Sequence, residues 1–394
     1  MSAKLVSGAA WLGGARVAVN LLGFVGTIIL ARLLTPADFG LVALAMSMLA
    51  IVSAFTDKSL NAALVQLQDA TTEHFHTMWT LSTLRGLAVA LVFAAISPLV
   101  ADIVDERRLI PVMLALAVSI LLAGLGNPRA IMMTKELIFW QQFMLEVGQK
   151  IFNLAASLAI AFVYQSYWAL IAGIIVGQLA GLLLSYTVLP FRPRPGFRHM
   201  RELFSFSAWL TLGGVVNTLN WRFDHLLIGG LLSKTALGFY TVGNNLAIIP
   251  TREIMTPLKN TLFPAFSRMN RDAQRMAAAY QRAQSTISLI VLPIGCGMAL
   301  IAEPFVLLAL GERWEPATIV IQGLAAIFAL QTLGSLGPSL AMATGQTRML
   351  FFRDLLGFAI RVPLIVAGML LGGLPGVIYA RVLSGTIGIA LNMS

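Results

Sequence analysis

The sequence predicts an all-α polytopic membrane protein with about twelve transmembrane helices in two six-helix bundles. Three observations predict this class. Only 11% of the 394 residues are charged and 58% are hydrophobic, whereas soluble domains carry about 25% charged residues. The apolar residues gather into stretches long enough for a helix to cross a bilayer core of about 30 Å. The second half of the chain also repeats the first.

Twelve apolar stretches of spanning length follow one another, separated by charged loops. Each is predicted to be a helix, because a backbone in hydrocarbon must satisfy its hydrogen bonds internally. The predicted spans cover residues 8–30, 40–66, 77–98, 109–133, 143–164, 167–189, 204–231, 238–256, 283–301, 317–342, 355–371 and 375–394. The short connection between the fifth and sixth spans predicts an antiparallel hairpin, and Gly173, Gly177 and Gly181 predict close helix packing there.

The loops between the spans predict the orientation of the chain. When the loops are numbered alternately from the N-terminus, one set holds 13 Lys and Arg residues and the other holds 5. Since basic loops remain in the cytoplasm, the first set and the N-terminus are expected to be cytoplasmic. The basic residues form no patch among aromatic ones, so no nucleic-acid partner is expected.

The two halves align at an offset of 198 residues near the start and 210 residues further on. The pairs that carry most weight are Trp11 with Trp209, Gly40 with Gly238, and Pro128 with Pro338. Six spans in each half make both halves enter the membrane in the same direction. A pseudo-two-fold axis along the membrane normal is therefore expected. The predicted domains are residues 1–189 and 204–394, joined by a basic cytoplasmic linker at 190–203.

Charges inside the predicted spans are the best indication of function, since a lipid-facing charge costs about 2.5–3.5 kcal/mol. Nine basic residues lie in or near spans: Arg16, Lys58, Arg85, Arg129, Lys150, Arg222, Arg252, Arg361 and Arg381. Only four acids accompany them: Asp57, Glu146, Asp224 and Glu253. The excess of positive charge predicts a cavity that attracts an anion, and the planar donor fork of Arg matches phosphate.

The candidate substrate-binding residues of this cavity are Arg16, Lys58, Arg85, Lys150, Arg222 and Arg361, and the candidate coupling or structural acids are Asp57, Glu146 and Asp224. Glu146 and Lys150 are four residues apart, which allows a structural pair on one helix face or a functional role. Asp224, followed by His225, is compatible with hydrogen bonds between helices or with a coupling-ion site.

Other kinds of chemistry have no support in the sequence. It contains neither a Gly-x-x-x-x-Gly-Lys-Ser/Thr run nor a Gly-x-Ser-x-Gly elbow. The four histidines make no metal set, and Cys296 is a lone cysteine. We therefore expect a protein that is not an enzyme, with no catalytic residue, no metal and no cofactor, and whose transport uses exchange or an ion gradient.

Three stretches carry a family resemblance: Ala31–Gly40, Asp224–Gly229 leading to Leu237–Tyr240, and Leu262–Arg268. Together they resemble the polysaccharide transporter (Wzx-type) flippases of the multidrug/oligosaccharidyl-lipid/polysaccharide superfamily. The resemblance implies translocation of an undecaprenyl-pyrophosphate-linked oligosaccharide across the bacterial inner membrane, for O-antigen, capsule or exopolysaccharide assembly. It also implies a basic central cavity, and as partners the membrane lipids, a polysaccharide polymerase and glycosyltransferases.

Two features depart from the family. His225 stands where members often carry Arg, and the 210 offset places Ser394 opposite Leu184, so the last span is expected to be truncated. Two alternatives stay open. A multidrug or cation antiporter of the same superfamily would need Asp57 or Asp224. A non-transporting scaffold for polysaccharide assembly would tolerate a change of every intramembrane charge.

Overall fold

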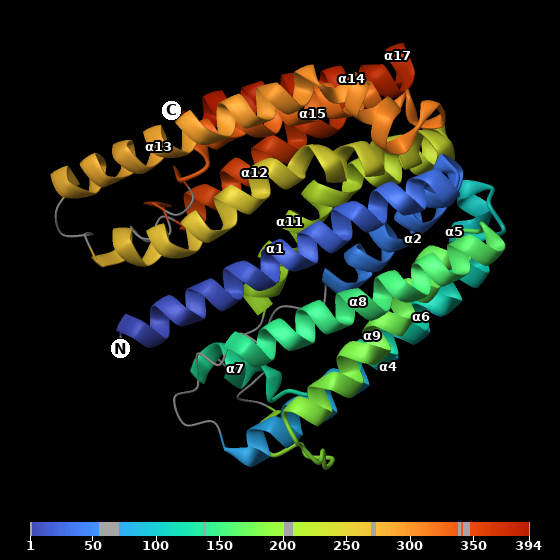
Figure 1. The fold of residues 1–394 in the computed structure, drawn as a ribbon, viewed down its shortest axis with the longest axis vertical. Coiled ribbons are helices and arrows are strands. Elements are labelled where there is room, and N and C mark those ends of the chain that lie inside the picture. Colours follow the sequence, from blue (N-terminus) through green and yellow to red (C-terminus); the bar gives the residue numbers. More distant parts are fainter. Residues whose placement is uncertain are drawn as a thin grey trace. The chain divides into compact units, whose positions relative to one another are not determined.

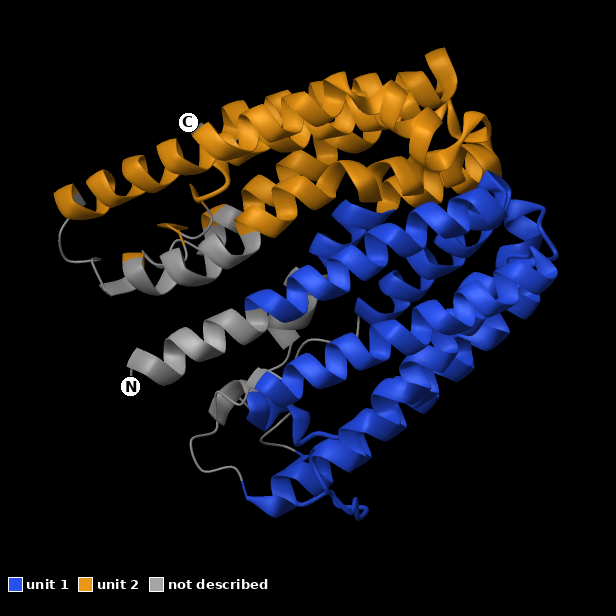
Figure 2. Cartoon of the chain, viewed as in Figure 1, with its two compact units in different colours: residues 1–222 blue, residues 223–394 orange. Residues whose placement is uncertain are grey.

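The computed structural model describes residues 2–54, 71–136, 139–200, 208–268, 273–337, 340–341 and 347–393 (Figure 1). Within these ranges all regular structure is helical, which confirms the predicted class. The chain divides into two compact units, Met1–Arg222 and Phe223–Ser394 (Figure 2).

Unit 1 contains long helices that overlap the first six predicted spans. They are α1 (Ser2–Leu33), α2 (Pro36–Ala54), α4 (Thr72–Ala95) with its continuation α5 (Ser97–Val104), α6 (Leu109–Gly124) followed by α7 (Ala130–Glu136), α8 (Phe139–Tyr164) and α9 (Trp168–Val188). The start of α2 is fixed by Thr35 and Asp38. The Asp38 carboxylate accepts from the Thr35 N–H at 2.9 Å, and the Asp38 N–H donates to the Thr35 hydroxyl at 3.3 Å. This reciprocal cap satisfies donors that a helix start leaves open.

The span predicted at 109–133 is interrupted, because α6 ends at Gly124 and α7 begins at Ala130. Pro128 lies in the gap, and a proline disfavours helix at the residue before it. Asn127 fastens the irregular stretch by donating to the carbonyls of Ser185 at 3.0 Å and Leu189 at 2.7 Å.

Helices α8 and α9 form the predicted hairpin, and the glycines of α9 face α8. A Cβ added at Gly177 would lie 2.8 Å from the Cβ of Asn153, and one at Gly181 would lie 2.9 Å from Oε1 of Gln149. Small residues at these positions let the two backbones approach closely, as the spacing predicted.

Unit 2 contains helices that overlap the last six predicted spans. They are α11 (Ala208–Leu227) with a π-helical turn, η1 (Ile228–Leu232), α12 (Lys234–Arg268), α13 (Ala273–Leu300), α15 (Ala317–Leu330) with η4 (Gln331–Gly334), and α17 (Thr347–Met393). Helix α11 crosses the division between the units. The connection from α13 to α15 carries α14 (Ala302–Phe305), η2 (Val306–Leu310) and η3 (Glu312–Trp314).

Helix α17 is two antiparallel limbs that meet at Gly372 and Gly373. Gly373 has φ +59°, which favours glycine, and neither residue is helical. Beyond the break the limbs run so close that a Cβ at Gly376 would overlap the backbone of Gly368. The two limbs correspond to the predicted spans 355–371 and 375–394.

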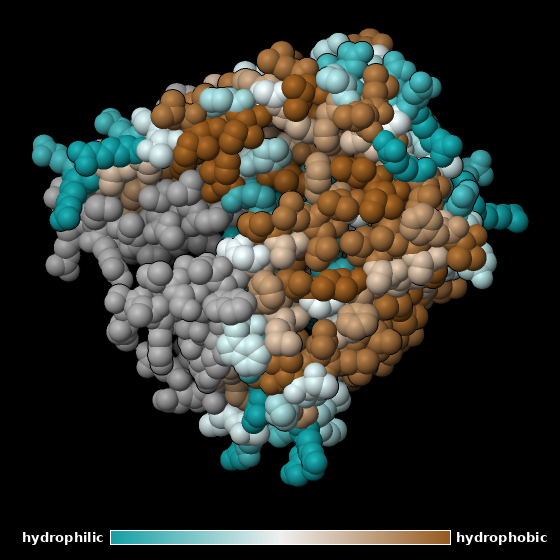
Figure 3. Space-filling view, in the orientation of Figure 1, coloured by the Kyte–Doolittle hydropathy of each residue, from teal (hydrophilic) through white to brown (hydrophobic). Residues whose placement is uncertain are grey.

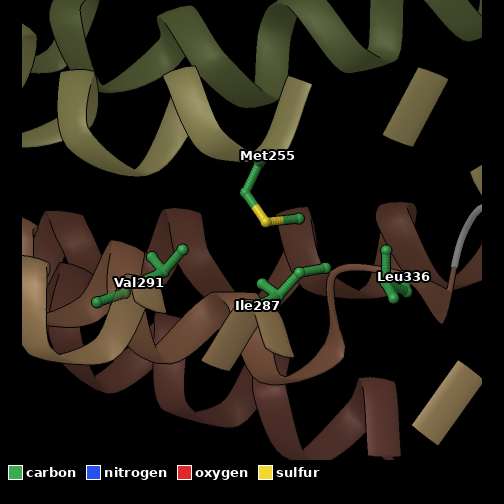
Figure 4. Close-up of a cluster of buried hydrophobic side chains, with 5 residues drawn as sticks. Met255, Ile287, Val291 and Leu336 are labelled. Atoms are coloured by element: carbon green, nitrogen blue, oxygen red, sulfur yellow. The ribbon is translucent and has the colours of Figure 1, made fainter. Parts of the chain in front are cut away.

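Part of the unit 2 core lies where α12, α13 and the turn after η4 meet. Figure 4 shows Met255 of α12 above Ile287 and Val291 of α13, with Leu336 beside them. All four side chains are buried. Lipid tails are as apolar as these side chains, so the cluster stabilises the unit through close packing more than through exclusion of water.

Large apolar side chains cover the outer faces of the helices. Figure 3 shows broad hydrophobic areas along the helices, with hydrophilic side chains gathered at helix ends. Leu371 is 89% exposed and Leu289 is 77% exposed. Within the described ranges, eight helical stretches are long and apolar enough to cross a membrane, and one of them, Phe352–Leu391, holds both limbs of α17.

Candidate functional site

The buried charges of unit 2 meet at the carboxylate of Asp224 on α11. Arg361, on the first limb of α17, donates from Nη2 to Oδ2 of Asp224. The Tyr240 hydroxyl on α12 donates to the same oxygen at 2.9 Å. Nε of Arg381, on the second limb of α17, lies 3.2 Å from it. These four residues, which we call the Asp224 cluster, join α11, α12 and both limbs of α17.

The Asp224 cluster is shielded from its surroundings. The Asp224 side chain is 3% exposed and that of Arg381 is 7% exposed. Removing an ion from water costs several kcal/mol, which attraction and hydrogen bonds must offset. Two guanidinium groups and the Tyr240 hydroxyl supply this attraction and hydrogen bonding to one carboxylate. The ring of His225 lies edge-on to that of Tyr240, with 5.3 Å between the ring centres. Interhelical bonding, one of the two roles considered for Asp224, is therefore present.

The cluster contains two residues that the sequence predicts as site residues and two that it does not. Asp224 and Arg361 were candidates for separate roles, an acid and a cavity base. Arg381 was recognised as an intramembrane charge but not as a site residue. Tyr240 was noted only within a family stretch. The available signal was that Arg361 and Arg381 both lie in spans without an acid of their own.

A cavity of about 230 Å³ lies within unit 1, lined by α2, α4, α6 and α9. Its polar lining consists of Ser53, Arg85, Ser119 and Gln178, and its remaining lining is apolar apart from Gly86. Arg85 is the charged residue among the described residues that line it. Hydroxyl, amide and guanidinium groups around one space can bind an anionic or hydroxyl-rich group.

Close packing of α4 on α6 sets the position of Arg85. A Cβ at Gly86, the next residue, would lie 2.9 Å from the Cα of Gly124 on α6. This contact holds the Arg85 turn of α4 against α6. A side chain at either glycine would push the helices apart and reshape the cavity.

The other candidates in unit 1 lie separately. Lys150 on α8 lies across Gly23 of α1, where an added Cβ would be 3.5 Å from its Nζ. Glu146 accepts a hydrogen bond from Nε2 of Gln142 at 2.8 Å. Among the ion pairs of the described residues, none joins Glu146 to Lys150. Arg16 is partly buried on α1.

Three further candidates complete the set. Arg222 is partly buried on α11, two residues before Asp224. Asp57 and Lys58 lie outside the described residues. No three His, Cys, Asp or Glu side chains within the described ranges come together as a metal site would require.

The two repeats differ at the position of the cluster. The offset of 198 places Asp224 opposite Gly26 of α1. A side chain at Gly26 would collide with Leu154 of α8. A close apolar contact in unit 1 therefore stands where unit 2 has a buried charge.

Two units of apolar helices of membrane length, with charged groups buried inside them, define a multi-pass helical membrane protein. A family model described as "Polysaccharide biosynthesis protein" matches residues 29–319. The chain belongs to this family, and its resemblance to Wzx-type polysaccharide transporters is confirmed.

Similar proteins include the lipopolysaccharide biosynthesis protein WzxC of Escherichia coli (strain K12), 25% identical over 95% of this chain and 77% of its own length. The succinoglycan biosynthesis transport protein ExoT of Rhizobium meliloti (strain 1021) is 24% identical over 84% of this chain and 67% of its own length. Among solved structures, the lipid II flippase MurJ in an inward closed conformation superposes with a TM-score of 0.78 at 14% identity. That match covers 96% of this chain and 86% of the MurJ chain, and it shows a shared fold.

Proposed function

We propose that the protein is a flippase that translocates an undecaprenyl-pyrophosphate-linked oligosaccharide across the bacterial inner membrane by alternating access. The product would serve O-antigen, capsule or exopolysaccharide assembly, together with a polymerase and glycosyltransferases. The observation that carries the proposal is the unit 1 cavity with Arg85 in its wall. It lies in a chain whose relatives are named for polysaccharide biosynthesis and transport.

The chemistry of the cavity suits the head of such a lipid. Pyrophosphate is an anion that Arg can bind through two parallel hydrogen bonds. Ser53, Ser119 and Gln178 supply donors and acceptors for sugar hydroxyls or phosphate oxygens. None of the described lining residues is acidic, which favours an anionic cargo over the cation of a multidrug antiporter.

The candidate residues then divide into two roles. Arg85 is assigned to the pyrophosphate, with Arg16, Lys58, Lys150 and Arg222 as further basic contacts along the path. Arg361 is assigned to holding the helices of unit 2, because Asp224 already binds its guanidinium. The N-terminus is assigned to the cytoplasm, on the distribution of Lys and Arg among the loops.

A reconstituted flipping assay tests the proposal. The purified chain is placed in vesicles with a fluorescent undecaprenyl-pyrophosphate-linked oligosaccharide, and an impermeant reductant bleaches the outer leaflet. With the chain present, the inner-leaflet pool should also become bleachable. Arg85→Gln should abolish this, and Arg107→Gln, at an exposed loop residue, should not. Export of a cationic dye without lipid movement would indicate an antiporter, and movement of neither would indicate a scaffold.

A further inference from the structure

The segment after α9, residues 190–200, is fastened along the first turns of α4, and we call it the basic segment. It has no regular structure over residues 190–197. The Arg194 N–H donates to Nδ1 of His76 at 3.1 Å, and the Gly196 N–H donates to the Thr80 hydroxyl at 2.9 Å. Two backbone donors bonded to consecutive turns of one helix hold the segment in a defined course.

Side chains fasten the basic segment at both ends. Near its start, Phe191 is buried, and the Arg129 guanidinium lies over its ring at 5.3 Å. Near its end, Nη1 of Arg198 donates to Oε2 of Glu73 at 2.9 Å. The segment is therefore attached to the body of unit 1 along its length.

Two aromatic side chains at this end of unit 1 indicate the level of the lipid headgroups. Nε1 of Trp79 donates to the Tyr186 hydroxyl at 3.0 Å, and that hydroxyl donates to the Leu125 carbonyl at 3.0 Å. Trp and Tyr concentrate at the level of lipid headgroups, where one end of the ring system is apolar and the other polar. Trp79 directly precedes Thr80, which binds Gly196, so the basic segment lies at the same level.

The outer side of the basic segment combines positive charge with apolar side chains. Arg192 and Arg194 are exposed. Phe197 is 57% exposed and Met200 is 44% exposed. At headgroup level, exposed guanidinium groups meet lipid phosphates, and exposed apolar side chains reach the acyl boundary.

We propose that the basic segment is a binding surface for anionic phospholipids of the surrounding bilayer. Arg192 and Arg194 contact the phosphates, and Phe197 and Met200 enter the acyl boundary. The charge is spread along an exposed surface, which suits exchangeable headgroups rather than one enclosed cargo. The inference does not depend on what the protein transports.

A site-specific fluorophore tests the proposal in the full chain. Cys296 is the one cysteine, so a Cys296→Ala, Met200→Cys chain takes a single bimane label on the basic segment. The labelled protein is reconstituted with doxyl-labelled phosphatidylglycerol or, at equal mole fraction, doxyl-labelled phosphatidylcholine. Phosphatidylglycerol should be enriched about fivefold for each arginine near the surface, and should quench the label more strongly. This preference should disappear at 1 M salt, where the Debye length is about 3 Å.

A matched pair of double variants distinguishes an effect of the basic segment from an effect of the overall positive charge of the chain. Arg192→Gln with Arg194→Gln should remove the preference, and Arg107→Gln with Arg313→Gln, which removes two exposed arginines from other loops, should leave it. Equal quenching by the two lipids in the labelled chain that keeps Arg192 and Arg194, or an equal loss of the preference in both double variants, would overturn the proposal. If undecaprenyl pyrophosphate relieved the quenching and unlabelled phosphatidylglycerol did not, the surface would be assigned to the cargo. That result would also overturn the proposal.

Discussion

Arg381, on the second limb of α17, lies with Nε 3.2 Å from Oδ2 of Asp224 on α11. The two residues come from the seventh and the twelfth predicted span. Their contact therefore joins the first helix of the C-terminal half to its last. Tyr240 on α12 bonds to the same carboxylate oxygen at 2.9 Å, so one acid holds three helices in register.

Separating this pair should destabilise unit 2. Asp224→Asn leaves two buried guanidinium groups without their acid, at a cost of about 3–5 kcal/mol. Arg381→Gln removes one of the two guanidinium partners of Asp224 and should cost less. Each should lower the thermal unfolding temperature of the detergent-solubilised chain. The double variant should lose about 0.5–3 kcal/mol less stability than the sum of the two single losses, because both substitutions remove the same interaction. Strict additivity would show that the pair is not coupled, and Arg313→Gln, at an exposed residue, is the control.

Changing Arg85 should affect export rather than folding. In a host whose own flippase is deleted, Arg85→Gln should lower surface polysaccharide more than tenfold while the amount of protein in the membrane is unchanged. Arg85→Lys should restore part of the export, because Lys keeps the charge but not the planar fork. Normal export by Arg85→Gln would remove the cavity from the transport path.

Two glycines of α17 should respond oppositely to alanine. A Cβ at Gly376 would overlap the Gly368 backbone, whereas one at Gly357 would meet nothing within 4 Å. Gly376→Ala should therefore cost about 1–3 kcal/mol through overpacking. Gly357→Ala should be neutral or stabilising by up to about 1 kcal/mol, because alanine favours helix. Thermal unfolding of both variants in one detergent measures the difference, and equal unfolding temperatures would contradict the packing.

Loosening the basic segment should expose it to trypsin. Arg192 and Arg194 precede prolines, and trypsin does not cut such bonds, so cleavage after Arg198 reports the opening. Thr80→Val removes a hydrogen bond worth about 1 kcal/mol and should raise the cleavage rate about fivefold.

Glu73→Gln removes the partner of Arg198. It should raise the cleavage rate less than Thr80→Val does, because an exposed ion pair contributes about 0.2–1 kcal/mol. Fragment masses identify the site. An unchanged rate in both variants, matching a Glu303→Gln control, would show that these contacts do not hold the segment.

The positions of the helices were largely predictable from the sequence, because membrane crossing requires uninterrupted apolar length. Each of the twelve predicted spans overlaps a helix of the described residues. The predicted and observed helices differ only in local detail. The span at 109–133 ends early at Gly124, and Pro128 supplies the reason.

The candidate site was predictable by residue type but not by partner. Asp224 and Arg381 lie at opposite ends of one half, and no short-range pattern reports such a contact. A local pairing also depends on the surroundings: the spacing allows a Glu146–Lys150 pair, and in the structure Glu146 accepts a hydrogen bond from Gln142. Both neighbours are four residues away, but the Lys150 side chain lies across Gly23 of α1 instead.

The glycine that stands opposite Asp224 in the repeat has a consequence for any exchange of helices between the two halves. The 198-residue offset pairs Gly26 with Asp224, so the two halves carry different residues at one repeat position. The acid has two arginine partners in unit 2, whereas Leu154 leaves no room for a side chain at Gly26 in unit 1. A rearranged gene that exchanged the two first helices would bring a carboxylate against Leu154 and leave Arg361 and Arg381 without their acid. Each first helix therefore fits only its own half of the chain.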